Sequence, residues 1–190
     1  MTHSVGLIIP CIPKHVAHLK DLLKSVAQST VRPAHVVVAL SDTLPTRGAL
    51  LQAQLQRLVP HSPLTVSSVR HPAWAAENRN RGARASKASI YSFIDADDLM
   101  LPRRLEVVLD AMGRHNADAV LHAYRNGGGS ELAPDAFAEV ERRDRSHPHL
   151  TTIPNLHHGH ITVRRAAYWG AGGQDESAQK RRGQDVHFVR

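Results

Sequence analysis

Short, continuous apolar runs alternate with segments of helical period, and this alternation constrains the fold more than any other feature of the chain. We predict strands at Val5–Ile9, Val36–Leu40, Leu64–Val69, Ile90–Ile94 and Asp118–Tyr124. The runs lack the period-two alternation of a half-exposed strand, which indicates burial on both faces. Strands that alternate with helices predict an α/β domain with a mostly parallel central sheet flanked by helices.

The segments between the runs carry apolar residues at helical spacing. We predict helices over His15–Gln28, Thr46–Leu58, Ala75–Lys87 and Pro102–Arg114. Thr46 is expected to cap its helix, and that helix is expected to face inward through Leu50, Leu51, Leu55 and Leu58. Beyond Tyr124 the pattern weakens, although His160–Arg164 resembles a strand and Gly183–Arg190 the start of a helix. We find no repeat or linker, so residues 1–190 are expected to form one domain.

Composition and termini exclude several classes of protein. Hydrophobic residues make up 42% of the chain, enough for a core, and the single cysteine, Cys11, allows no intrachain disulfide. No apolar run reaches the roughly 18 residues that a transmembrane helix needs. The first residues also do not resemble a signal peptide. A cytoplasmic protein is therefore expected.

The charge is unevenly distributed. The net charge is +7, and residues 1–94 hold 11 Lys and Arg against three acids. A basic half suits a polyphosphate ligand, but a solvated basic surface explains it equally well. A basic nucleic-acid-binding domain is a further alternative, but the aromatic content of 4% and the lack of a recognition module argue against it.

Three carboxylates crowd the end of the fourth predicted strand, at Asp95, Asp97 and Asp98. They repel one another, so burial at a strand end would require a cation or hydrogen-bond donors nearby. A divalent ion meets this need and also bridges to phosphate oxygens. In parallel sheets, ligands bind beyond the carboxyl ends of the strands. The alternative is a polar turn in which Asp98 caps the next helix.

Several short motifs, taken in order, resemble the GT-A-fold glycosyltransferases, in particular their family 2-like group. The motifs are Val5–Pro10, Leu22–Thr30 with Pro33 and Val36–Val38, Arg79-Asn80-Arg81-Gly82, Ile90–Asp98, Arg164-Arg165, Gly172-Gly173 and Gly183–Val186. The resemblance covers nearly the whole chain. It implies a single GT-A, or Rossmann-like, domain.

The resemblance implies that residues 1–98 form a nucleotide-sugar-binding half. Asp95 would contact the ribose or base of a UDP- or GDP-sugar, and Asp97 would ligate Mn²⁺ or Mg²⁺ on the diphosphate. Asp98 is a weaker candidate for either task. Arg79 and Asn80 are further donor-binding candidates, with a solvated basic helix as the alternative.

Two other parts of the donor site follow from the resemblance. Pro10 matches the proline that closes the family's opening strand. The family has acidic residues just after its second strand, where this chain offers Ser41 and, slightly late, Asp42. We therefore expect either Ser41 or Asp42 to help to hold the nucleotide.

Residues 99–190 would form the acceptor and catalytic half. Asp185 matches the general base that deprotonates the acceptor hydroxyl of a glycan or other molecule, with inversion at the anomeric carbon. The family's Glu before this base is Gln184 here, so an ordinary acid at a helix N-terminus is the alternative for Asp185. The chain stops five residues later, so a degenerate domain that binds a nucleotide or sugar without turnover remains a second hypothesis.

Histidines and tryptophans offer weaker candidates. The cluster His157–His160 could line the acceptor site, lie on a surface loop or, least of all, bind zinc. Trp74 and Trp169 could stack on a sugar or base, with ordinary packing as the favoured alternative. The chain has no P-loop, dinucleotide-binding or nucleophile-elbow motif.

Overall fold

The computed structural model describes residues 4–121 and 160–177. Within them a six-stranded sheet has the order β3-β2-β1-β4-β6-β5. The strands are β1 (Val5–Cys11), β2 (His35–Leu40), β3 (Leu64–Ser68), β4 (Ile90–Phe93), β5 (Ala119–Leu121) and β6 (Ile161–Arg164). The helices are η1 (Pro13–His15), α1 (Leu19–Ala27), α2 (Pro45–Gln56), α3 (Ala75–Ala85), α4 (Arg104–Arg114) and α5 (Arg165–Gly170).

The first four strands run parallel, as the sequence predicts. β1 lies between β2 and β4, and β2 pairs with β3 on its other side. The sheet then changes direction, because β6 runs antiparallel to β4 and β5 antiparallel to β6. The carboxyl ends of β1 to β4 therefore meet at one edge of the sheet, where the polar segments converge.

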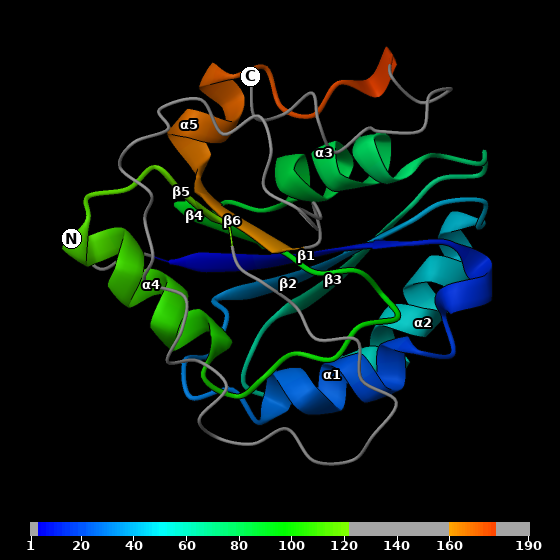
Figure 1. Ribbon diagram of the computed structural model, residues 1–190. Helices are drawn as coiled ribbons and strands as arrows, with labels where there is room; N and C mark the ends of the chain where they lie inside the picture. The colour runs from blue at the N-terminus through cyan, green and yellow to red at the C-terminus, as the bar shows by residue number, and fades with distance from the viewer. Residues whose placement is uncertain (1–3, 122–159, 178–190) are drawn as a thin grey trace.

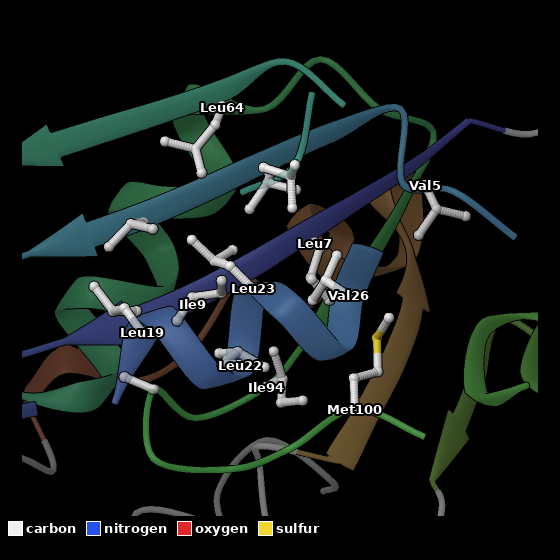
Figure 2. Packing of buried hydrophobic residues seen from close by; sticks show 14 of the residues in the cluster. Val5, Leu7, Ile9, Leu19, Leu22, Leu23, Val26, Leu64, Ile94 and Met100 are labelled. Carbon is white, nitrogen blue, oxygen red and sulfur yellow. The ribbon is translucent and has the colours of Figure 1, made fainter. Parts of the chain in front are cut away.

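Helices cover both faces of the sheet, as Figure 1 shows. α1, α2 and α4 lie on one face, and α3 and α5 lie on the other. Alternate residues of β1 feed the two cores: Leu7 and Ile9 pack with α1, whereas Ile8 packs with Tyr91 and Tyr168. Figure 2 shows the larger core around Leu19, Leu22 and Leu23 of α1. Burial on both faces confirms what the unbroken apolar runs indicate.

A glycine allows α3 to lie close against the sheet. A Cβ on Gly82 would come within 2.6 Å of Cγ2 of Ile8 and 3.4 Å of Cβ of Ala39. Both neighbours are fully buried on the two central strands. The glycine of the Arg-Asn-x-Gly motif therefore sets the distance between the sheet and the helix that carries Arg79.

The structure differs from the expected elements in detail. The first α-helix begins at Leu19 rather than His15, because Pro13–His15 forms a separate 3₁₀ turn. Thr46 does not cap α2, which instead has Leu44 as its N-cap and Pro45 in its first turn. Leu50 is 69% exposed, so the inward face predicted for α2 is wrong at that residue. Among the described residues, no helix is both long and apolar enough to cross a bilayer.

Candidate functional site

The acidic cluster follows β4 directly, at the carboxyl edge of the parallel strands. The amide of Ile94 donates to the carbonyl of Ile8, which prolongs the pairing of β4 with β1 by one residue. The amide of Asp98 then donates to the carbonyl of Asp95 and closes a turn. These bonds fix the backbone that presents Asp95, Asp97 and Asp98.

Each of the three carboxylates has a basic partner from a different element. Arg79 of α3 donates from Nη2 to Oδ1 of Asp95 at 2.8 Å. His15 of η1 lies with Nδ1 3.6 Å from Oδ2 of Asp97. His160, just before β6, lies with Nε2 3.6 Å from Oδ2 of Asp98. The cluster therefore collects four separate parts of the chain around one turn.

The three carboxylates differ in how far their side chains are exposed to solvent. Asp97 and Asp98 have side chains that are 48% and 42% exposed, whereas Asp95 is 21% exposed and faces the buried Arg79. A planar guanidinium on a carboxylate fixes the orientation of both groups. Asp95 is therefore held in place by α3, and the more open Asp97 and Asp98 are accessible to a ligand.

The segment after β2 forms a second wall at the same edge. The Ser41 hydroxyl is buried and donates to the carbonyl of Ala73, and the Asn78 amide lies 3.4 Å from both Oγ of Ser41 and the carbonyl of Cys11. Asp42 instead has an exposed side chain and a φ of 50°. Its backbone amide donates to the carbonyl of His71. Of the two candidates, Asp42 is the one that presents its side chain to solvent.

Asn80 lies at the centre of a buried polar network rather than at an open surface. Its Oδ1 accepts from the Tyr168 hydroxyl at 2.6 Å and from the Gln174 amide at 2.9 Å. Its Nδ2 donates to the carbonyl of Gln174 and to Oε1 of Glu176, both at 2.8 Å. Asn80 thus ties α3 to the turn that follows α5, and its role in donor binding stays a prediction.

The turn itself depends on glycine. Gly173 has a φ of +75°, and a Cβ there would lie 2.8 Å from Oδ1 of Asn80. No motif in the sequence marks Tyr168, Gln174 and Glu176 as partners of Asn80. The Gly172-Gly173 pair is the sequence signal that indicates the turn, because adjacent glycines mark backbone that other residues avoid.

The remaining candidate residues differ in how deeply they are buried. Pro10 is buried within β1, opposite Ala39 of β2. Trp74 is the N-cap of α3 and is 58% exposed. Trp169 packs edge-on against Tyr168, carries the guanidinium of Arg84 over its ring and donates from Nε1 to the hydroxyl of Tyr91. Packing thus explains Trp169.

Comparison with known proteins identifies the family to which this arrangement belongs. The model of the family "Glycosyl transferase family 2" matches residues 7–171, which include the acidic turn, the segment after β2 and α5. The chain belongs to glycosyl transferase family 2. A curated relative, an uncharacterized glycosyltransferase of Haemophilus influenzae, is 28% identical over 137 residues, which are 72% of this chain and 42% of the relative.

Solved structures of glycosyltransferases share the GT-A fold of this chain. TarS of S. aureus in complex with UDP-GlcNAc matches with a TM-score of 0.71 and 18% identity, over 98% of this chain and 52% of TarS. The mannosyltransferase PcManGT of Pyrobaculum calidifontis, in complex with GDP-Man and Mn²⁺, matches with a TM-score of 0.70 and 18% identity, over 98% of this chain and 50% of its own. This family 2 chain therefore spans about half the length of these relatives.

The metal-ligating side chains of this family 2 site suit a divalent ion only if a bound ligand supplies part of the coordination. In residues 4–121 and 160–177, no three His, Cys, Asp or Glu side chains are grouped so that they could hold a metal. Magnesium-type ions in enzymes often use one or two carboxylates together with substrate phosphates and water. The exposed carboxylates of Asp97 and Asp98 fit that pattern.

The candidate base lies outside the described residues. Asp185 and its neighbour Gln184 fall within residues 178–190, and His157 and His158 fall within residues 122–159. The described chain reaches Ser177, beyond the turn that Asn80 holds. The structure thus describes the acidic turn and the segment after β2, but not the candidate base.

Proposed function

We propose that this protein transfers a sugar from a nucleoside-diphosphate sugar to a hydroxyl group of an acceptor, with a divalent metal ion and with inversion at the anomeric carbon. The observation that carries the proposal is the acidic turn at the end of β4, whose carboxylates meet Arg79, His15 and His160 from three other elements. Membership of glycosyl transferase family 2 supports the class of reaction.

The residues divide the binding of the donor between them. Asp95, fixed by Arg79, would accept a hydrogen bond from the ribose or base, and the exposed Asp42 borders the same edge of the sheet. Asp97, with Asp98 beside it, would hold Mn²⁺ or Mg²⁺ on the diphosphate. TarS with UDP-GlcNAc and PcManGT with GDP-Man and Mn²⁺ support a UDP- or GDP-sugar as the donor and a metal ion as its companion.

The reaction needs a base and a stabilised leaving group. Asp185 takes the proton of the acceptor hydroxyl while the oxygen of that hydroxyl bonds to the anomeric carbon. The bond from this carbon to the diphosphate oxygen breaks on the opposite side. A single displacement of this kind inverts the configuration. The metal ion, when bound, stabilises the negative charge that develops on the diphosphate. Arg79 orients the donor through Asp95 and takes no part in proton transfer.

Donor binding by Asp97 variants tests the proposal. Titration of UDP-, GDP- and dTDP-sugars with and without Mn²⁺ is expected to show metal-dependent binding to the natural protein. Asp97→Asn keeps the size of the side chain but removes its charge, and it should weaken metal-dependent binding by about tenfold or more. The matched control is Asp110→Asn, since Asp110 lies on the exposed side of α4 and pairs with Arg114.

The outcomes separate the two hypotheses about turnover. Binding with transfer to an acceptor supports the enzyme, whereas binding without transfer to any acceptor in a broad panel supports a degenerate donor-binding domain. Equal donor affinity in Asp97→Asn and Asp110→Asn would contradict the proposed site.

A further inference from the structure

A buried arginine lies directly behind the acidic turn. Arg104 is the first residue of α4, yet only 7% of its surface is exposed. Its Nη2 donates to the carbonyl of Phe93 at 2.5 Å, and Phe93 is the last residue of β4. A charged side chain is rarely buried to this degree without a specific partner, because the removal of a guanidinium from water is unfavourable.

The negative charges of the acidic turn act on this guanidinium. Burial lowers the pKa of Arg104 to about 10, and the negative charges of Asp98 and then Asp95 act in the opposite direction, in favour of the charged form. Arg104 therefore stays protonated at neutral pH. Its charge acts on the acidic turn from inside the protein.

The other basic partners approach the turn from other elements. The side chain of His15 is 26% exposed beside Asp97, and that of His160 is 12% exposed beside Asp98. Arg79 reaches Asp95 from α3, on the opposite face of the sheet from α4. Arg104 differs because it also holds the backbone at the residue that precedes the turn.

We propose that Arg104 is a positioning residue for donor binding: it fixes the end of β4 through the Phe93 carbonyl and balances the charge of Asp98 and Asp95, so that Asp97 is presented in one orientation. Arg104 acts through the turn and touches no substrate. Three carboxylates within four positions repel one another, and a fixed internal cation removes much of that cost before any metal ion arrives. The donor-binding part of this inference rests on the proposed function.

A double-mutant cycle on stability tests the charge balance without a donor. Arg104→Met keeps much of the side-chain volume and removes the charge, and it should lower the folding equilibrium constant by about tenfold or more in urea denaturation. In an Asp98→Asn background the same change should cost at least about threefold less, because one of the uncompensated carboxylates is gone. The matched control is Arg103→Met, which removes an exposed charge that pairs with Glu106 on the same helix.

Donor affinity tests the positioning. Arg104→Met should weaken metal-dependent binding of UDP- or GDP-sugars by about tenfold, whereas Arg104→Lys, which keeps the charge, should recover part of the loss. Arg103→Met should bind as the natural protein does. Hydrogen exchange at the amides of Ile94 and Asp98 should accelerate in Arg104→Met and not in Arg103→Met.

The results decide between a positioning role and simple packing. An equal loss of stability in both backgrounds, or natural donor affinity in Arg104→Met, would overturn the proposal. If Arg104→Met folds only together with Asp98→Asn, the rescue supports it, and failure to fold in both backgrounds overturns it. A natural protein that binds no donor at all refutes the proposed function, and in that case the stability cycle alone decides the role of Arg104.

Discussion

At the scale of single residues, Cys11 links the core to the site. It ends β1, its side chain is buried, and burial raises the pKa of its thiol to about 12, with Asp97 adding to the effect. The unfolded chain loses this proton above about pH 9, while the folded protein keeps it. The unfolded state therefore binds fewer protons in this range, and the contribution of Cys11 to stability should fall as the pH rises from 9 towards 12.

Cys11→Ala provides the measurement. At about pH 8 the variant should be less stable than the natural protein, because it leaves a cavity beside Leu40 in the core. By about pH 10 the difference should shrink by roughly 1 kcal/mol, since alanine has no proton to lose. Urea denaturation at both pH values in metal-free buffer checks this. A constant difference would show that the thiol has the same pKa in the folded and unfolded states, and a difference that grows with pH would show that folding lowers its pKa.

Residue type and position predicted the crowding of carboxylates at the end of β4. Asp95, Asp97 and Asp98 follow an apolar run of strand length in the sequence, and the structure brings them together in one turn. The buried partners could not be found in this way. Arg104 looks like an ordinary polar residue of a helix in the sequence, and only the fold shows that it faces the Phe93 carbonyl. Asn80 stands out through its motif, but only the fold shows that it bonds to the turn at Gln174.

At the scale of elements, the approach of α3 to the sheet depends on Gly82. Gly82→Ala places a methyl group against Ile8, which is fully buried in the central strand and has little room to move. The added methyl should shift α3 and destabilise the fold by about 1–3 kcal/mol. Because α3 also carries Arg79, metal-dependent donor binding should weaken in the folded fraction. Chemical denaturation and donor titration measure the two effects.

Gly113 of α4 gives the matched control. A Cβ there meets no described atom within 4 Å, so Gly113→Ala should be neutral or should stabilise the protein by about 0.5–1 kcal/mol through helix propensity. Equal effects of the two substitutions would mean that crowding at Ile8 does not limit the position of α3.

The periodicity of the sequence predicted where the strands and helices lie better than it predicted the strand directions and the buried face of α2. Burial of β1, β2 and β4 follows from their largely apolar runs, because such runs need cover on both faces, whereas β3 is polar at several positions and only partly buried. The direction of β5 and β6 did not follow, since strand direction depends on connections rather than on composition. The inward position predicted for Leu50 of α2 is wrong because leucine spacing alone does not show which face of a helix meets the sheet.

At the scale of the whole molecule, the positive net charge attracts an anionic ligand, whereas the acidic turn repels it. The net charge of +7, concentrated in residues 1–94, attracts any polyanion at low salt. The acidic turn repels a polyanion unless a metal ion intervenes. Selective donor binding and non-selective attraction to nucleic acid should therefore respond differently to salt, to Mn²⁺ and to substitution at Asp97.

Fluorescence anisotropy with a short labelled DNA duplex, beside donor titration, compares the two. Binding to DNA should be weak and should fall by about tenfold between roughly 50 and 200 mM salt if about two phosphates are neutralised. Asp97→Asn removes a negative charge, so it should leave DNA binding unchanged or slightly stronger while it weakens metal-dependent donor binding. Salt-sensitive DNA binding that exceeds donor affinity and that Asp97→Asn leaves unchanged would instead favour the nucleic-acid-binding alternative, because a surface that neutralises many phosphates loses affinity steeply with salt.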